Sequence, residues 1–220
     1  MKKVLKITLV IFIIILIKLI ITFTINEILI SNYNNGINKE ELIPILKKLN
    51  TNEPYIVYYN EANIKYNEKN YQESLEGYNK SLSKNPPQKK ICNIRINKTL
   101  TLIKLIDSND KQTVLEKLEE ARNNLYEDGC ANPNDNSGKS MEAEELEEKI
   151  KEMEEELNNN NNSSTANNQQ EEKNEEETEE EQNLEKELEE IRKNATTNRN
   201  QELDDLQNSN DFSYYSGKRW

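Results

Sequence analysis

Hydrophobic residues are arranged in two ways along this chain, as one continuous run near the beginning and at periodic spacings after it. The run covers residues 7–25 and reads ITLVIFIIILIKLIITFTI. As a helix it would be about 28 Å long, close to the thickness of the hydrocarbon core of a bilayer. The single Lys18 costs roughly 3 kcal/mol on insertion scales, which the surrounding apolar side chains outweigh. The pattern predicts a transmembrane signal anchor over residues 7–30, after a basic segment over residues 1–6.

The charges around the apolar run predict its orientation. Lys2, Lys3 and Lys6 precede the run, whereas the chain after Glu27 carries no charge until Lys39. By the positive-inside rule, the basic segment lies in the cytoplasm and the chain from about residue 32 onward is extracytoplasmic. No small-x-small cleavage site and no cysteine follow the run closely, so we expect a retained single-pass anchor in the cell membrane.

Beyond the run, apolar residues recur at spacings of three and four, which is typical of helices. Residues 38–49 predict a short leading helix with Pro44 in its first turn. One helical hairpin follows over residues 58–87. A second hairpin is indicated by Ile91, Ile94, Leu100, Ile103 and Ile106 and, after the loop IDSNDK, by Val114, Leu115, Leu118, Ala121 and Leu125. The predicted fold class is all-α, with a transmembrane helix, a short array of helical hairpins over residues 38–130, an acidic helix and a largely disordered tail.

The first hairpin resembles a tetratricopeptide repeat, a pair of antiparallel helices of about 34 residues. Tyr58 stands at the large aromatic position, and Ala62 at the small position where the helices approach closely. The residues that follow at the family's spacings are Tyr71, Ser74, Tyr78, Ser81 and Pro86. The departures are Glu61 in place of leucine, Lys65 in place of tyrosine and Lys69 in place of the turn glycine. An ordinary amphipathic hairpin is the alternative, with nearly the same architecture.

The resemblance implies a binding groove, because the first helix of each tetratricopeptide repeat lines the concave side of the array. It places Tyr59, Asn63 and Tyr66 in that groove. The alternative is that these three side chains pack against the next hairpin. No lysine stands beside the asparagine, as it does in repeats that bind C-terminal carboxylates, so that class of ligand is not expected.

The two cysteines stand at the two ends of the second hairpin. Cys92 lies at the start of its first predicted helix, and Cys130 follows the second. An antiparallel hairpin would bring both to the same end, and an extracytoplasmic location would allow them to oxidise. A disulfide closing a loop of this size would contribute about 4 kcal/mol. The alternative is two unpaired thiols, one of them buried.

The region after the hairpins is acidic, and residues 142–193 carry 21 acidic and 6 basic side chains in a chain of net charge −12. Residues 140–157 predict an acidic amphipathic helix, which would either dimerise or fold back on the repeats. Its apolar seam consists of Ala143, Leu146, Ile150, Met153 and Leu157. Residues 158–210 are too poor in apolar side chains to fold alone, which predicts a disordered, low-complexity spacer with a short helix over residues 184–193.

The last ten residues, 211–220, read DFSYYSGKRW and combine aromatic with basic side chains. Rigid aromatic anchors and basic groups after a polar tether are typical of a short docking peptide that binds an acidic surface. The alternative is that the peptide folds back onto its own chain. The candidate binding residues are Phe212, Tyr214, Tyr215, Lys218, Arg219 and Trp220.

Composition argues against catalysis. Only 34% of the residues are hydrophobic, and most of the membrane run's apolar residues are unavailable for a core, so a large single-core enzyme is not expected. The chain has no histidine, which removes the commonest general base and zinc ligand, and two cysteines alone cannot form a structural zinc site. We therefore predict no catalytic residue, no metal and no cofactor. Clustered acidic charge also argues against nucleic acid as a partner.

The layout of a membrane anchor, a short repeat domain, the turn at Gly129–Ala131 and a charged tail resembles the BatC-like repeat proteins. These proteins accompany von Willebrand A-domain and MoxR-type ATPase systems in bacterial envelopes. The resemblance implies an adaptor that binds other proteins, among them von Willebrand A-domain membrane proteins. The alternative is a structural tether or surface spacer that acts through its acidic tail.

Overall fold

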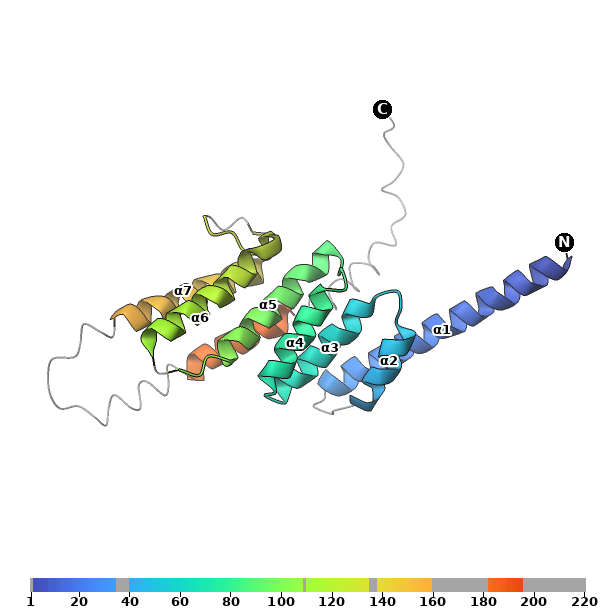
Figure 1. The fold of residues 1–220 in the computed structure, drawn as a ribbon, viewed down its shortest axis with the longest axis horizontal. Coiled ribbons are helices and arrows are strands. Elements are labelled where there is room, and N and C mark those ends of the chain that lie inside the picture. The colour runs from blue at the N-terminus through green and yellow to red at the C-terminus, as the bar shows by residue number, and fades with distance from the viewer. Residues whose placement is uncertain (1, 35–39, 109, 135–137, 160–181, 196–220) are drawn as a thin grey trace, which may run out of the picture. The chain divides into compact units, whose positions relative to one another are not determined.

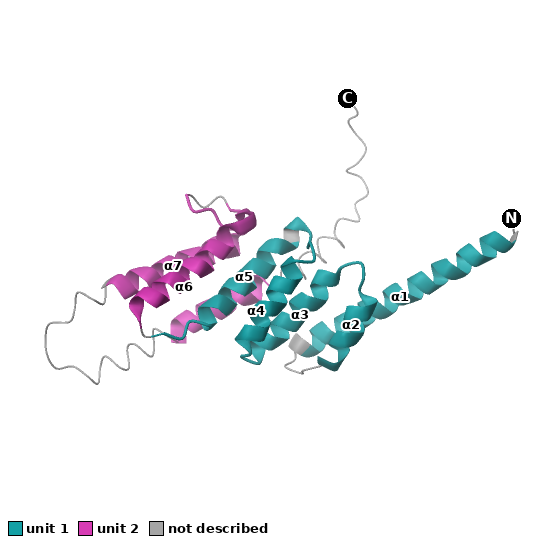
Figure 2. Ribbon diagram, viewed as in Figure 1, with its two compact units in different colours: residues 1–109 teal, residues 110–220 magenta. Residues whose placement is uncertain are grey.

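The computed structural model describes residues 2–34, 40–108, 110–134, 138–159 and 182–195 (Figure 1). These residues form helices and the turns that join them, with no strand among them, so the all-α prediction is confirmed. The chain divides into two compact units, unit 1 over Met1–Asn109 and unit 2 over Asp110–Trp220 (Figure 2).

The boundary between the units falls inside the region that the sequence predicts as one repeat domain, residues 38–130. In unit 1 the helix α5, Gln88–Lys104, packs against α4, Tyr71–Leu82. In unit 2 the helix α6, Lys111–Tyr126, packs against the acidic helix α7, Met141–Asn159. The periodic pattern of α5 and α6 identifies two helices, but it does not specify which helix each of them packs against.

Unit 1 begins with α1, Lys2–Asn34, one uninterrupted helix that extends past both ends of the predicted anchor. It is long and apolar enough to cross a membrane, which confirms the coarse part of the anchor prediction. Its side chains from residue 3 to residue 17 are all exposed. In its second half, Asn26 and Leu29 are buried.

The rest of unit 1 consists of short helices with turns that the sequence specifies locally. A 3-10 turn, Glu40–Leu42, leads into α2, Ile43–Leu49, and α3 covers Pro54–Asn67. Pro44 and Pro54 stand in the first turns of α2 and α3, where a missing backbone N–H costs nothing. The chain reverses after α3 at Lys69, which adopts a φ of 61°.

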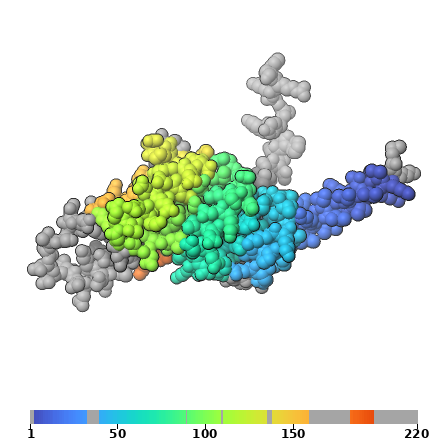
Figure 3. Space-filling view, viewed as in Figure 1, coloured from blue at the N-terminus to red at the C-terminus, as the bar shows by residue number. Residues whose placement is uncertain are grey.

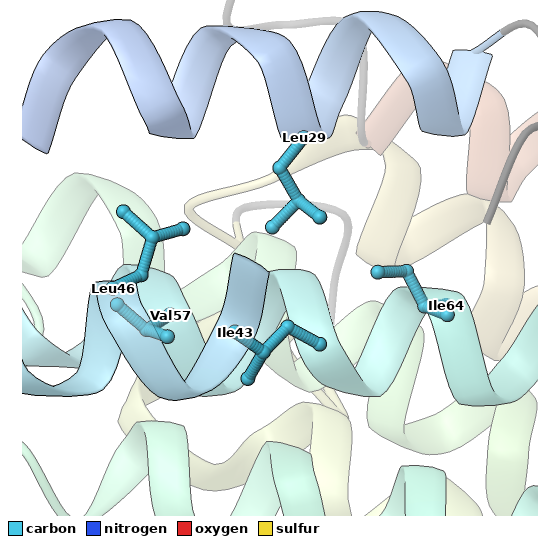
Figure 4. Packing of buried hydrophobic residues seen from close by; sticks show 5 residues of the cluster. All are labelled: Leu29, Ile43, Leu46, Val57 and Ile64. Atoms are coloured by element: carbon cyan, nitrogen blue, oxygen red, sulfur yellow. The ribbon is translucent and has the colours of Figure 1, made fainter. Parts of the chain in front are cut away.

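Two apolar clusters form the core of unit 1. The first joins three elements, because Leu29 of α1 packs against Ile43 and Leu46 of α2 and against Val57 and Ile64 of α3 (Figure 4). The second cluster lies among α3, α4 and α5 and consists of Tyr55, Ala62, Tyr78 and Ile94. The α1 helix is therefore part of the folded unit as well as the candidate membrane segment.

The predicted small positions of α4 are used for hydrogen bonds to α3. The Ser74 hydroxyl donates to the Ala62 carbonyl oxygen at 2.9 Å, and the Ser81 hydroxyl donates to the Tyr55 carbonyl oxygen at 2.9 Å. Both serines are fully buried. A serine at these sites therefore fills the small space and also satisfies its own buried hydroxyl.

Unit 2 contains α6, α7 and a further helix over residues 182–195. Asp110 caps α6, because its carboxylate accepts hydrogen bonds from the Thr113 backbone N–H at 2.9 Å and the Thr113 hydroxyl at 2.6 Å. These bonds to the charged form lower the pKa of Asp110. The helix over 182–195 is longer than the predicted 184–193, and Lys149 of α7 forms an ion pair with its Glu187 at 2.8 Å. Residues 160–181 and 196–220, which contain most of the predicted spacer and the C-terminal peptide, lie outside the described residues.

Candidate functional site

Two of the three predicted groove residues, Tyr59 and Asn63, belong to a polar cluster between α3, α4 and α5. Asn63 is 3% exposed, and its Oδ1 accepts a hydrogen bond from the Tyr78 hydroxyl at 2.6 Å. Asn97 of α5 donates from Nδ2 to the Tyr59 hydroxyl oxygen at 2.7 Å and lies 3.4 Å from Asn63 Oδ1. Tyr59 and Asn63 therefore help to hold α5 against α3.

Asn97 itself is fully buried, and its Oδ1 has no hydrogen-bond partner among the described residues. A buried acceptor that is left unpaired costs roughly 1–3 kcal/mol. The cluster therefore combines good hydrogen bonds with one unsatisfied atom.

Tyr66 also lies in an interface within unit 1. Its side chain is 6% exposed, and its ring meets the Tyr71 ring edge to face, with centroids 5.3 Å apart. Together with the burial of Asn63, this placement favours the packing role that the sequence left open for the three residues. Their role in binding stays a prediction, and a partner that used Asn63 or Tyr66 would first have to separate packed helices.

The two departures from the repeat pattern on α3 are explained by the segment that precedes it. Glu61 forms an ion pair with Lys47 of α2 at 2.8 Å. Lys65 forms ion pairs with Glu40 at 2.5 Å and with Glu68 at 3.1 Å. The hydrogen bond to Glu40 is the main cause that raises the pKa of Lys65 above its ordinary value, with Glu68 adding to it. Charged residues stand at these positions because charged residues of the leading segment lie opposite them.

The α1 helix uses one stripe of its surface to contact the rest of unit 1. Lys18 Nζ donates to the Thr51 hydroxyl oxygen at 2.8 Å, and Asn60 Nδ2 donates to Asn26 Oδ1 at 2.9 Å. Leu29, which is 1% exposed, continues the stripe. The first half of α1 makes no such contact with the part of unit 1 that the structure describes, and it protrudes clear of α2 and α3 (Figure 3).

Unit 2 holds a polar cluster between α6 and α7 that sequence reasoning missed. The Tyr126 hydroxyl donates to Glu147 Oε1 at 2.5 Å, and Glu147 also forms an ion pair with Lys151 at 2.8 Å. Arg122 forms an ion pair with Glu154 at 2.6 Å. Glu147 is 3% exposed although it belongs to a glutamate-rich helix.

Burial changes the pKa values of this cluster. It raises the pKa of the Glu154 carboxyl above its ordinary value, although Arg122 acts in the opposite direction. It also raises the pKa of Tyr126, and the hydrogen bond to Glu147 adds to that effect. The seven-residue spacing of Glu147 and Glu154 is the feature of the sequence that indicates this cluster, because it places both side chains on one face of α7.

The remaining candidates for a functional site are the cysteines, as a disulfide, and the acidic side chains, as metal ligands. Cys92 is 6% and Cys130 0% exposed, and neither is a free thiol in the structure. Formation of the predicted disulfide in the cell stays a prediction. Among the described residues, no three side chains of Asp, Glu or Cys are grouped so that they could hold a metal ion.

The predicted docking peptide, with Phe212, Tyr214, Tyr215, Lys218, Arg219 and Trp220, lies outside the described residues.

No protein-family model, no curated protein and no solved structure matches the chain.

Proposed function

We propose that the chain is a membrane-anchored helical scaffold that recruits other proteins to a membrane surface. One observation supports this proposal most directly. The α1 helix leaves its apolar side chains exposed over residues 3–17, while its second half packs into the core of unit 1. An exposed apolar helix of this kind has a clear role in lipid, and the helices attached to it are then held at the membrane.

The proposed orientation places the basic segment in the cytoplasm and the remaining helices outside it. Lys3 and Lys6 stand at the N-terminal end of the exposed stretch, as the positive-inside rule requires for a cytoplasmic end. Because the chain resembles tetratricopeptide and BatC-like proteins, we propose that the scaffold belongs to an envelope complex. Von Willebrand A-domain membrane proteins are among its proposed partners.

The outer face of α4 is one exposed surface of unit 1 that a partner can reach. The α3 helix is packed by α1, α2 and α4, whereas Gln72, Glu76, Asn79 and Lys80 of α4 are exposed. These positions are spaced by three and four residues, so they form one polar stripe. A partner could bind this stripe without disturbing the buried polar cluster.

The test replaces the stripe and leaves the core intact. Full-length protein with Gln72→Arg, Glu76→Arg and Asn79→Arg is compared with wild type after cross-linking in membranes and extraction in mild detergent. An adaptor should lose a specific partner that wild type retains, while its helical circular dichroism is unchanged. A matched triple variant on α6, Gln112→Arg, Glu116→Arg and Glu120→Arg, should retain the partner. Retention of every partner by the α4 variant would reject this binding face.

The alternative function is a tether that acts through charge and reach. It is supported by α7, whose nine glutamates and two lysines leave most of its surface acidic. A chain with residues 160–181 scrambled at equal composition should then function like wild type. Loss of function on scrambling would reject the tether and favour a specific contact in that segment.

A further inference from the structure

We infer that the bilayer ends at Lys18, so that lipid surrounds residues 3–17 and the loop between α2 and α3 lies among phospholipid headgroups. This inference rests on the proposed membrane anchor and assigns its depth. The sequence alone favours a span over residues 7–25, in which Lys18 lies well inside the hydrocarbon.

Protein begins to cover one stripe of α1 at Lys18, whereas Leu19, Ile20, Ile21 and Phe23 beyond it stay exposed. Every side chain from residue 3 to residue 17 is exposed, and Lys18 is the first that is partly covered. Thr22, Ile25, Asn26 and Leu29 continue the covered stripe at spacings of one helical turn. Lipid cannot surround the part of a helix that is covered by protein, so the full circumference of α1 is available only before Lys18.

The contact between Lys18 and Thr51 sets the depth of the loop. Because Lys18 Nζ donates to Thr51 Oγ1 at 2.8 Å, the Lys18 ammonium and the Thr51 hydroxyl lie at nearly the same level in the membrane. Thr51, Asn52 and Glu53 are exposed and polar. A span over residues 7–25 would carry this loop, including the Glu53 carboxylate, into the hydrocarbon, where insertion scales penalise charge strongly.

The shorter span is long enough when its flanking lysines are included. Residues 3–17 form about 22 Å of helix, less than the roughly 30 Å of a typical hydrocarbon core. Lys3 and Lys6 stand at one end and Lys18 at the other, and long lysine side chains place their ammonium groups at the interface while their stems stay in lipid. Local thinning of the bilayer accommodates the remaining difference.

The α2 helix supplies a second, independent observation. Among the described residues of unit 1, Ile45 is the exposed large hydrophobic side chain outside α1, with 44% of its surface exposed. Lys48, three residues later on the same helix, is also exposed. An apolar and a basic side chain side by side on a short helix that leads into the Thr51 loop fit the headgroup region, outside the edge of the hydrocarbon.

The experiment measures depth with single tryptophans in the full chain. Trp220→Phe removes the one native tryptophan, and Val10→Trp or Ile21→Trp is then added. Proteins are reconstituted in phosphatidylcholine vesicles that carry bromine either near the bilayer centre or near the headgroups. Residue 10 is the middle of a span over 3–17, whereas residues 10 and 21 are nearly equidistant from the middle of a span over 7–25.

We expect bromine near the bilayer centre to quench Val10→Trp at least about twofold more than Ile21→Trp, with the opposite order for bromine near the headgroups. A third variant, Ile45→Trp, should be quenched by bromine near the headgroups alone. Equal quenching of Val10→Trp and Ile21→Trp would overturn the depth assignment, and an Ile45→Trp variant that no lipid quenches would overturn the contact of α2 with the headgroups.

Flotation of the same vesicles separates this inference from the proposed function. A protein that fails to float with the vesicles would overturn both the membrane anchor and the depth. A protein that floats but shows equal quenching at residues 10 and 21 would overturn the depth alone. Circular dichroism of each variant in the vesicles establishes that the helices are intact.

Discussion

Gly77 of α4 packs directly against Ala62 of α3, so closely that a Cβ added to Gly77 would lie 2.7 Å from the Ala62 Cβ. Carbon atoms in contact normally stay about 3.5–4 Å apart, so the helices would have to separate. The sequence predicted that position 62 is small because two helices meet there, but it did not identify Gly77 as the opposite residue. The relationship is consistent with the close approach of α3 and α4.

Gly77→Ala should therefore destabilise the protein although alanine favours helix. The gain in helix propensity is about 1 kcal/mol, whereas overpacking costs roughly 1–3 kcal/mol. We expect a lower midpoint in urea denaturation followed by circular dichroism. Asn79→Ala on the exposed face of α4 is the control and should have little effect. A Gly77→Ala protein more stable than wild type would contradict the close packing.

Tyr78→Phe should weaken the buried polar cluster. It removes the hydroxyl that donates to Asn63 Oδ1 at 2.6 Å and leaves only the longer contact from Asn97 at 3.4 Å. The expected loss is about 1–2 kcal/mol of unfolding free energy, measured in urea. Tyr71→Phe, which keeps the ring against Tyr66, is the matched control and should change stability by less than about 0.5 kcal/mol. Equal effects of the two substitutions would show that the hydrogen bond contributes nothing.

Lys69→Gly should stabilise unit 1. Lys69 adopts a φ of 61°, a left-handed conformation that costs an ordinary residue roughly 1–2 kcal/mol and glycine very little. Glycine loses more entropy on folding, so the net gain should be roughly 0.5 kcal/mol. Thermal unfolding should show a higher midpoint for Lys69→Gly and no gain for Lys69→Ala. A lower midpoint for the glycine variant would contradict the strained turn.

The α6–α7 pair should become less stable as pH rises through the pKa of Glu154. Burial raises this pKa above the ordinary value of 4.5, so the folded chain binds the proton more tightly than the unfolded chain. The contribution of Glu154 is therefore most favourable below pH 4.5 and is lost as pH rises through the raised folded value. Glu154→Gln should remove this part of the pH dependence.

Hydrogen exchange of the α6 and α7 amides in the full chain measures the effect between about pH 4 and pH 7. The comparison is the difference between wild type and Glu154→Gln, since other carboxylates titrate in both proteins. Glu156→Gln, on the exposed face of α7, should behave like wild type. An unchanged pH dependence in Glu154→Gln would show that Arg122 compensates fully for burial.

Local patterns in the sequence were enough to predict most helices. The apolar run predicts α1, Pro44 marks the first turn of α2, and periods of three and four predict α3 to α7. Lys69 was identified as the site where the repeat pattern expects glycine, and the structure places a left-handed turn there. These features depend on residues close together in the chain, and periodicity reports on such residues directly.

Contacts between distant residues were not predictable in the same way. The α1 helix contacts α3 through Leu29 and Asn26. These residues lie within or beside an apolar run, so hydrophobic periodicity does not distinguish the side of α1 that they share. Glu61 and Lys65 were identified only as departures, because their partners Lys47 and Glu40 belong to another segment. Burial of Asn63 likewise depends on Tyr78 and Asn97, which a single-helix pattern does not relate to it.

The continuity of α1 has a mechanical consequence. Lys2–Asn34 contains neither glycine nor proline, so the helix has no residue that favours a kink between its exposed half and the half that carries Leu29. A bilayer whose hydrocarbon core is thinner than the span tilts a spanning helix, and a rigid helix transmits that rotation to whatever is fixed to it. The helices packed on Leu29 would turn with α1, and the outer face of α4 would then report the thickness of the membrane to a bound partner.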